Sequence, residues 1–430
     1  MTKRIFASPI GRRNVLGGAA AAGMALAAPN LARAQGPVEI EYWQYTFDVR
    51  VRAIDQLIER FQRANPNIRV KHQHFPYAQY RTKVASAIPA GEGPDVVQLF
   101  YGWVDDYIRA NLLRPLEGDA FAPALVDREF FPLVQAMKRE GKYYGIPTAV
   151  RSLALMWNKR LFTAAGLNPN EPPRTLDAYV DMAKRMTQRD AQGNLVQAGS
   201  AIMPDGQDLG WYREVLVRQF GGQPYSDDAR RVMYNSESGV NAMKWYTDLI
   251  TVHRVGDVGF MGEQPAAFRA GRAALCVDGS FRVGAYASLR GLEFGVAELP
   301  IHNDRKSNYA SYWVNGISAR ATGAKLDAAQ KFLAFVTTPE AMELWLQVVG
   351  ELPARTAAAL TPANINHPQF GPFIKGLEYA HATRFVQEDP QRQVLMDAID
   401  RIRLQNQPVA ASIAQAAAEE QRLLDAFYRA

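Results

Sequence analysis

Apolar and polar positions follow each other at the start of the chain in a way that predicts strands and helices in turn. Residues 38–43 alternate with period two, as in a strand, and the apolar positions between 54 and 61 recur at helical spacing. Residues 68–75 predict a second strand and residues 80–88 a second helix. The run 95–100 is apolar without polar alternation, which is typical of a parallel strand covered on both faces. This order of elements predicts a doubly wound α/β domain.

The rest of the chain continues the α/β pattern with more helix. We expect strands at 152–157, 273–277 and 293–299, helices at 175–187, 210–220, 239–252 and 328–337, and a helical tail from about Pro390. The chain has no repeat of fixed period and no long low-complexity linker. Two domains in such a chain must be joined by short crossings, which favours a hinge.

The first 34 residues have the layout of an export signal. The pair Arg12-Arg13 is followed by an Ala/Gly-rich run over 17–28 and a small-residue cleavage site that ends at Ala34. An apolar run of Ala and Gly rather than Leu favours the twin-arginine route, and it is too short to remain in a membrane. A mitochondrial presequence has a similar composition but more often forms an amphipathic Arg/Ser helix. We therefore expect cleavage after Ala34 and a periplasmic protein without a lipid anchor, since the only cysteine, Cys276, lies far from that site.

Composition and charge narrow the possible classes of partner. The chain has 430 residues, 48% of them hydrophobic, which is enough for two cores. It carries 49 basic and 43 acidic residues, but five of the basic ones lie in the leader, which has no acidic residue. The remainder is close to neutral, so charge gives no argument for nucleic acid or an anionic membrane surface. We expect the single cysteine, Cys276, to be a buried strand residue rather than a nucleophile.

An ordered series of short patterns runs through the chain after the leader. The patterns are Tyr42-Trp43-Gln44, Ala90-Gly91-Glu92-Gly93-Pro94-Asp95-Val96-Val97, Tyr144-Gly145-Ile146-Pro147, Leu155-Met156-Trp157-Asn158-Lys159-Arg160-Leu161-Phe162, Ala165-Gly166-Leu167, Pro172-Pro173-Arg174-Thr175-Leu176, Phe268-Arg269-Ala270-Gly271-Arg272-Ala273-Ala274, Asp278-Gly279-Ser280-Phe281, Trp313-Val314-Asn315-Gly316 and Gly350-Glu351-Leu352-Pro353-Ala354-Arg355. Each alone is weak. In this order, behind an export signal, they resemble the extracellular solute-binding proteins of bacterial ABC importers, in the carbohydrate-binding branch that includes maltose-binding protein.

The resemblance implies a fold class: α/β, a two-lobed periplasmic binding protein with hinge crossings between two doubly wound lobes. It places the crossings near residues 149–151, near 299–300 and after about Thr337. The first lobe would comprise residues 35–149 and 300–337, and the second 150–299 and 338–430, behind the signal peptide 1–34. It also implies that a ligand binds between the lobes, which close on it, and that the permease of an ABC importer recognises the closed form. We expect a monomer that is not an enzyme and needs no cofactor or metal.

Sugar recognition needs flat apolar surfaces for the ring faces and planar or charged groups for the hydroxyls. The first predicted strand ends on such residues, where open α/β sheets bind ligands, so we expect some of Trp43, Gln44 and Tyr45 to line the cleft rather than pack at the edge. Asp95, at the start of the third strand, either contacts ligand or caps the local backbone. After that strand, the segment that often supplies an aromatic ring and a carboxylate in this family offers Tyr101 and Asp105, with Trp103 between them.

Arg151 departs from the maltose-binding pattern, which has an acidic residue near this crossing. A buried arginine there can hold an anionic substituent of the ligand through two hydrogen bonds. The alternative is an ion pair between Arg151 and a carboxylate at the hinge or between the lobes. The sequence leaves both readings open.

Further candidates come from the later segments. They are the aromatic Trp211 at a helix start, beside Tyr212; Gly279 and Ser280, where backbone can approach a ligand at a strand end, beside Phe281; Tyr312 and Trp313, of which we expect at least one to stack on a sugar; Gly316 behind them; and Arg355. For Trp211 the alternative is a place in the core, and for Arg355 a surface ion pair.

Several other chemistries find little support. The chain has no phosphate-binding loop of the Gly-x-x-x-x-Gly-Lys-Ser/Thr type, no Gly-x-Ser-x-Gly elbow and no His-Glu-x-x-His helix. His72 and His74 share one face of a strand, but two ligands without a third predict no metal site. A carbohydrate-binding protein is thus our main interpretation. The alternatives are a binder specific for an anionic, sulfonated or phosphorylated, glycoside and a periplasmic enzyme that acts on sugars.

Overall fold

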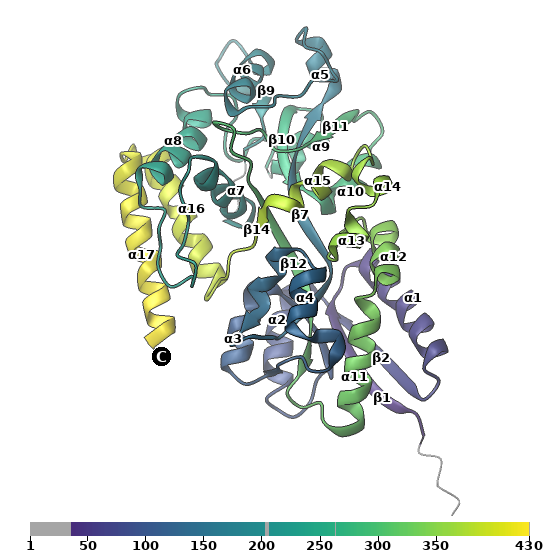
Figure 1. Ribbon diagram of the computed structural model, residues 1–430. Coiled ribbons are helices and arrows are strands. Elements are labelled where there is room, and N and C mark those ends of the chain that lie inside the picture. Colours follow the sequence, from purple (N-terminus) through teal and green to yellow (C-terminus); the bar gives the residue numbers. More distant parts are fainter. Residues whose placement is uncertain (1–35, 203–205, 263, 430) are drawn as a thin grey trace, which may run out of the picture. The chain divides into compact units, whose positions relative to one another are not determined.

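The computed structural model describes residues 36–202, 206–262 and 264–429 (Figure 1). The predicted export signal, including Arg12-Arg13 and the cleavage site at Ala34, lies outside the described residues. The strands are β1 (Val38–Tyr45), β2 (Ile68–Phe75), β3 (Val96–Phe100), β4 (Leu113–Arg114), β5 (Lys138–Arg139), β6 (Lys142–Tyr143), β7 (Ile146–Asn158), β8 (Gln188–Arg189), β9 (Leu195–Ser200), β10 (Ala273–Gly279), β11 (Phe294–Ala297), β12 (Asn308–Ser318), β13 (Leu352–Pro353) and β14 (Ala380–His381).

Helices connect these strands. They are α1 (Asp48–Ala64), α2 (Tyr77–Ala87), α3 (Val104–Arg109), α4 (Pro123–Glu129), α5 (Lys159–Ala164), α6 (Leu176–Met186), α7 (Gly206–Gln219), α8 (Glu237–Thr251), α9 (Gln264–Arg269), α10 (Val283–Ala287), α11 (Gly323–Val336), α12 (Pro339–Val349), α13 (Thr356–Ala359), α14 (Pro362–Ile365), α15 (Gly371–Gly376), α16 (Glu388–Gln405) and α17 (Val409–Arg429). Short 3₁₀ turns are η1 (Tyr101–Trp103), η2 (Asp119–Phe121), η3 (Pro132–Met137), η4 (Ser280–Arg282) and η5 (Leu377–Tyr379).

The first five elements form the parallel unit that the sequence predicts. Strands β2, β1 and β3 lie side by side in this order, and both pairings are parallel. The register from Val38↔Ile68 to Tyr45↔Phe75 brings the carboxyl ends of β1 and β2 to one edge. Every residue of β3 is buried, as its unbroken apolar run indicates. The predicted strands and helices of this segment are confirmed.

Two long strands in the middle of the sheet join its two halves. Strand β12 runs antiparallel to β3 and to β7, and the far half of β7 pairs with β10 and β11. The change of partners along β7 falls between Ser152, opposite Ala310 of β12, and Leu153, opposite Gly279 of β10. Both strands are buried along their whole length, so their polar side chains need internal partners. Asn315 of β12 supplies one example, because it accepts a bond from the Tyr42 hydroxyl at 3.0 Å and donates to Thr148 at 3.1 Å.

The second half of the sheet continues through β10, β9 and β8, and Cys276 lies buried in β10 as predicted. Helices α16 and α17 lie side by side and pack against α7 and α8 (Figure 1, yellow). A buried polar network joins them: Glu420 of α17 accepts hydrogen bonds from Tyr234, at 2.7 Å, and from Tyr225 and Arg213. Among the described residues, no helix is long and apolar enough to cross a membrane.

Helix α12 packs against α1 and against β7. The structure thus sets α12 beside α1 of the predicted first lobe, although residues from 338 onward are predicted to belong to the second. The residue bounds of the two lobes remain a prediction.

Candidate functional site

Five aromatic side chains gather where the strands β1, β2 and β3 end. We call Tyr45, Phe47, Tyr77, Trp103 and Trp313 the aromatic platform. The Tyr45 ring lies 4.2 Å from the Trp313 ring, 5.5 Å from Tyr77 and 6.3 Å from Phe47, centroid to centroid. Trp103 meets Trp313 edge to face at 5.3 Å. Since all three strands are parallel, their carboxyl ends bring residues from three separate segments together with the β12 residue Trp313.

The platform is buried on one side and open on the other. Tyr45, Trp103 and Trp313 are at most 8% exposed, whereas Phe47 is 39% and Tyr77 55% exposed. Exposed apolar side chains that lie next to each other, unlike scattered single ones, can mark a binding surface. Their exposure at the rim provides apolar ring faces that a ligand can reach from solvent.

Beneath the platform lies a buried ion cluster of Arg50, Glu351 and Arg151. Arg151 Nε donates to Glu351 Oε1 at 2.6 Å, and Arg50 Nη2 donates to the same oxygen. Trp345 Nε1 donates to Glu351 Oε2 at 2.9 Å, and Arg50 Nη1 to the Tyr45 hydroxyl at 2.6 Å. Burial alone would raise the pKa of Glu351, but the charges of Arg151 and Arg50 outweigh it and lower that pKa to about 2.

The cluster contains two guanidinium groups and one carboxylate, so it carries a net positive charge. The arginines also lie over aromatic rings: Arg50 Cζ is 5.1 Å from the Tyr45 centroid, and Arg151 Cζ is 4.6 Å from that of Phe281. The carboxylate partner that the sequence analysis left open for Arg151 is present, and it is Glu351. A contact between Arg151 and ligand remains a prediction.

Both predicted carboxylates have protein partners. Asp105 Oδ1 accepts from Arg139 Nε at 2.7 Å and Arg384 Nη2 at 2.9 Å, and Oδ2 accepts from Arg139 Nη2 at 2.6 Å and Arg384 Nε at 2.8 Å. Although burial raises the pKa of Asp105, these bonds more than offset it and lower the pKa. Asp95 accepts the backbone N–H of Glu41 at 2.9 Å, as in the capping alternative, with Lys325 Nζ 3.6 Å away.

A second aromatic group forms around Tyr309 of β12. Tyr101 and Tyr309 share a hydrogen bond between their hydroxyls, and the Tyr101 ring stacks on Tyr312 at 4.7 Å. Trp211 stacks on Tyr309 at 5.7 Å, and its buried indole N–H has no hydrogen-bond partner among the described residues. Three predicted residues, Tyr101, Tyr312 and Trp211, are thus brought together from three distant segments.

The remaining candidates are more scattered. The Trp43 ring contacts Phe75 at 4.8 Å, and Gln44 is fully buried with neither amide atom hydrogen-bonded to a described residue. A side chain at Gly279 would collide with the Phe281 ring, and the neighbouring Ser280 hydroxyl is buried without a partner.

Two further candidates, Gly316 and Arg355, lie close to other parts of the protein. Gly316 lies in β12, where an added Cβ would come within 3.0 Å of the Tyr144 carbonyl oxygen. Arg355 pairs with Glu129, donates to the Thr337 carbonyl at 2.7 Å and covers the Phe130 ring. Ligand roles for the candidate residues remain predictions.

Phe47, Tyr77, Arg50 and Glu388 are not among the residues predicted from the sequence. Phe47 and Tyr77 follow β1 and β2 at the same sheet edge as Tyr45, and this position after a strand could have identified both as candidate ligand residues. Glu388 had none. It accepts a hydrogen bond from Trp103 Nε1 at 3.0 Å, although they are 285 residues apart, and burial raises its pKa to about 7.

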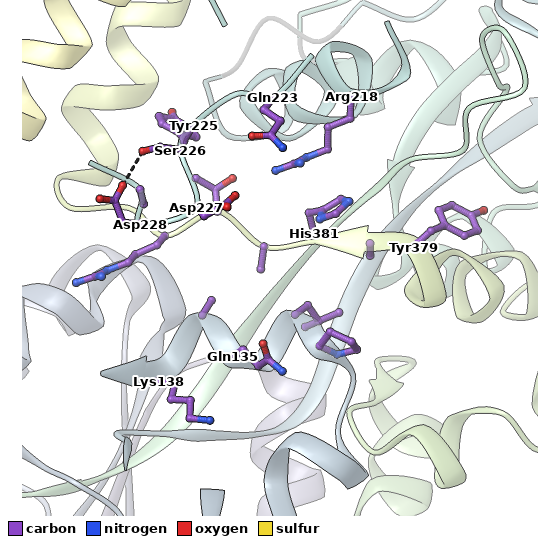
Figure 2. A pocket seen from close by; sticks show the side chains of 18 of the residues that line it. Gln135, Lys138, Arg218, Gln223, Tyr225, Ser226, Asp227, Asp228, Tyr379 and His381 are labelled. Carbon is purple, nitrogen blue, oxygen red and sulfur yellow. Dashed lines mark hydrogen bonds between the residues drawn. The ribbon is translucent and has the colours of Figure 1, made fainter. Parts of the chain in front are cut away.

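A cavity in the described part of the chain is lined by none of the residues of the aromatic platform, but its lining includes Arg139 and Arg384, which bind Asp105. It has a volume of about 680 Å³ and is lined by residues from segments 132–139, 218–229 and 378–384 (Figure 2). None of the predicted ligand-binding residues lines it. Among the described residues, no group of three or more His, Cys, Asp or Glu side chains is arranged to hold a metal ion.

The family model described as bacterial extracellular solute-binding protein matches residues 56–372, well over half of the chain. The chain belongs to this family. It is a family of binding proteins.

Relatives of this solute-binding protein are similar over most of its length. The maltotriose-binding protein of Pyrococcus abyssi is 24% identical over 80% of this chain and 73% of its own length. The galactooligosaccharide-binding protein of Bacillus subtilis is 25% identical over 69% of each chain. The sn-glycerol-3-phosphate-binding periplasmic protein of Yersinia pestis is 25% identical over 76% of each chain.

Solved structures resemble this solute-binding protein more fully than sequences do. The cyclic alpha-maltosyl-1,6-maltose binding protein from Arthrobacter globiformis superposes with a TM-score of 0.80 at 22% identity, over 90% of this chain and 99% of that one. A cyclo/maltodextrin-binding protein complexed with maltotetraose gives a TM-score of 0.77 at 19% identity, over 91% and 99%. These likenesses confirm the predicted fold class, a two-lobed α/β binding protein.

Proposed function

We propose that this solute-binding protein captures a carbohydrate on the aromatic platform and delivers it to the membrane permease of an ABC importer. The platform is the observation that carries the proposal. Its exposed rings, Phe47 and Tyr77, offer flat apolar faces to a sugar ring, and buried guanidinium groups lie directly behind. Similarity to proteins named for maltotriose and galactooligosaccharide binding supports the same ligand class.

The remaining parts of the proposal follow from the sequence. The protein would leave the cytoplasm through the twin-arginine route, lose its leader after Ala34 and work in the periplasm as a monomer without a lipid anchor. It would not be an enzyme. Its two lobes would close on the ligand, with crossings near residues 149–151, near 299–300 and after about Thr337.

A second candidate is a carbohydrate derivative that carries an anionic group. The specific observation behind it is the excess of buried positive charge, two arginines on the single carboxylate Glu351. An anionic substituent near Arg151 would balance that charge. Similarity to a protein named for sn-glycerol-3-phosphate binding supports this candidate.

A thermal-shift screen of the mature chain, from Gln35 onward, separates the candidates. The panel holds neutral mono- and oligosaccharides, anionic glycosides, polyols, amines and metal ions. A ligand at about a hundred times its dissociation constant stabilises the folded state by roughly 2.7 kcal/mol, which moves the midpoint visibly. Stabilisation by a neutral sugar supports the first candidate, and stabilisation by anionic glycosides alone the second. Stabilisation by amines or metals and by no sugar would contradict both.

Tyr77→Ala then tests whether the platform is where the ligand binds. Tyr77 is largely exposed, so its loss should leave stability nearly unchanged while affinity for the sugar found in the screen falls about five- to tenfold, as loss of a stacking surface implies. The matched control is Leu404→Ala, a truncation at a similarly exposed position of α16. Equal affinity in both variants would move the binding site away from the platform. Product formed from the sugar on prolonged incubation would instead support the enzyme alternative.

A further inference from the structure

The 680 Å³ cavity of Figure 2 is of a size that proteins use for small ligands. Its walls come from three separate parts of the chain: η3 and β5, the end of α7 with the loop after it, and β14 with its flanking residues. None of the residues of the aromatic platform or of the Arg50–Glu351–Arg151 cluster lines it. A ligand in this cavity would therefore occupy a site of its own.

Three of the four lysine and arginine side chains that line the cavity have acidic partners. Lys138 Nζ lies 2.6 Å from Asp127 Oδ2, and Arg139 and Arg384 both bind Asp105. Because two arginines share the single carboxylate of Asp105, these three cations keep one excess positive charge, which favours an anion in the cavity.

Arg218, at the end of α7, differs from the other cations. It is half-buried, its Nε atom is buried without a hydrogen-bond partner, and no described acidic side chain lies within ion-pair distance. A guanidinium donor that has lost its water and found no acceptor is costly to maintain unless another molecule supplies the acceptor. The Thr383 hydroxyl, in a residue only 6% exposed, is a second buried lining group without a partner.

The polar side chains beside Arg218 can form hydrogen bonds with the hydroxyl groups of a ligand. Figure 2 shows Arg218 and Gln223 on one side of the cavity with His381 facing them. Desolvation and the nearby charge of Arg218 lower the pKa of His381 to about 4, so at neutral pH its ring offers one donor and one acceptor. Asp227 and Glu378 also line the cavity, but both are exposed, so water screens them while they still accept hydrogen bonds.

We propose that this cavity is a second binding site, in which Arg218 holds the carboxylate of a small hydroxylated acid. The partnerless guanidinium selects a carboxylate, and the hydroxyl groups of the ligand bind Gln223, His381 and Thr383. The site does not depend on the carbohydrate proposed for the platform.

The test uses D-gluconate as the probe and D-glucitol as its uncharged counterpart. Calorimetry on the mature chain should detect gluconate, whereas glucitol should bind at least about tenfold more weakly, because it lacks the charge that Arg218 binds. Arg218→Gln should weaken gluconate binding by about tenfold or more. The matched control is Arg290→Gln, which removes an exposed arginine outside the cavity and should change nothing.

Further measurements distinguish gluconate binding in this cavity from binding at the platform, and loss of binding from misfolding. Trp313→Ala should leave gluconate affinity unchanged. The His381 ring signal, identified among the six histidines by His381→Gln, should shift on gluconate addition in the wild type and in the Trp313 variant. If Arg218→Gln folds poorly, Gln223→Ala at an exposed position should still weaken gluconate several-fold. Absence of gluconate binding up to about 10 mM, equal affinity in Arg218→Gln, or loss of binding in Trp313→Ala would each overturn the proposal.

Discussion

At the scale of single residues, Glu351 is a buried carboxylate that depends on its hydrogen-bond and ion-pair partners. It lies just after Gly350, the C-cap residue of α12, is 3% exposed, and its carboxylate is the acceptor for Arg50, Arg151 and Trp345. Removing one member of a buried ion cluster costs more than the pair contributes, because the charge left behind is no longer solvated. The folded state therefore depends on Glu351 being ionised.

We therefore expect the free energy of unfolding to fall in acid, as Glu351 becomes protonated. The pKa of Glu351 falls from 4.5 to about 2 on folding, so its contribution is complete above about pH 4.5 and is lost as the pH falls toward 2. The loss amounts to roughly 3 kcal/mol of the free energy of unfolding, measured by urea unfolding at a series of pH values.

Glu351→Gln should lower the free energy of unfolding at pH 7 by about 3–5 kcal/mol and flatten its decline in acid. The control is Glu340→Gln, at an exposed position at the start of α12, which should keep the wild-type pH dependence. An unchanged acid slope in the Glu351 variant would contradict the role given to this carboxylate.

Trp313 and Trp43 give a second residue-level prediction. Trp313 belongs to the platform, whereas the Trp43 ring contacts Phe75 and donates to Glu41. Trp313→Ala should weaken binding of the sugar ligand by about 1–3 kcal/mol in calorimetry through loss of a stacking surface. Trp43→Ala should have a smaller effect. A loss that is equal in both variants would return Trp43 to the ligand-contacting set, and no loss in either would show that the stacking sites are misplaced.

At the scale of elements, Asp105 ties three of them together. It lies in α3, Arg139 in β5, and Arg384 in the segment between β14 and α16. Two fork-shaped guanidinium groups use both carboxylate oxygens, an arrangement that fixes orientation as well as distance. The segment leading into α16 is thereby fastened to the first half of the chain.

Asp105→Asn should loosen that segment. An amide cannot accept from both arginines in this geometry, so we expect a loss of about 2–4 kcal/mol in the free energy of unfolding. Hydrogen exchange should rise selectively over residues 383–392. Asp106→Asn is the control, since this neighbouring, more exposed carboxylate has Arg81 as its one ion-pair partner among the described residues. Exchange that rises equally in both variants would rule out a specific fastening role.

At the scale of the whole molecule, β7 and β12 carry the connection between the two halves of the sheet. Their polar residues are paired inside it, as in Asn308, which accepts from Leu153 N at 3.1 Å and donates to Leu153 O at 2.9 Å. A binding protein that closes on its ligand needs a crossing that bends without breaking such pairs. The lobes and their closure belong to the proposed function.

Export is the whole-molecule property that can be tested most directly. Replacing Arg12 and Arg13 together by Lys should abolish delivery to the periplasm, because the twin-arginine route reads the guanidinium pair. Fractionation of a bacterial host with an antibody to the mature chain measures this. Undiminished export of the double variant would point to the general secretion route.

Local pattern was enough to predict much of the first half of the fold. The alternation in β1 and β2 and the unbroken apolar run of β3 reflect burial on one or two faces, which a short stretch of sequence reports directly. The sequence also pointed to Tyr45 and Trp313 as candidate ligand residues. The structure brings the two rings together, although their contact with a ligand remains untested.

Strand β12 shows where local pattern stops being informative. Its Asn, Ser and Gly residues weaken the apolar signal, yet every residue is buried, because partners such as Tyr42 and Thr148 satisfy its polar groups from other strands. A strand of this kind is stable only when its neighbours are in place.

The sequence by itself was enough to predict the strands and helices of the first α/β unit and to show the resemblance to solute-binding proteins. Tertiary structure alone decided that Arg151 meets Glu351, 200 residues away, and that Arg218 faces His381 across a cavity built from three segments. The physical reason is that periodicity encodes which face of an element avoids water. It carries no information on which distant residue supplies the opposite charge or the missing hydrogen bond.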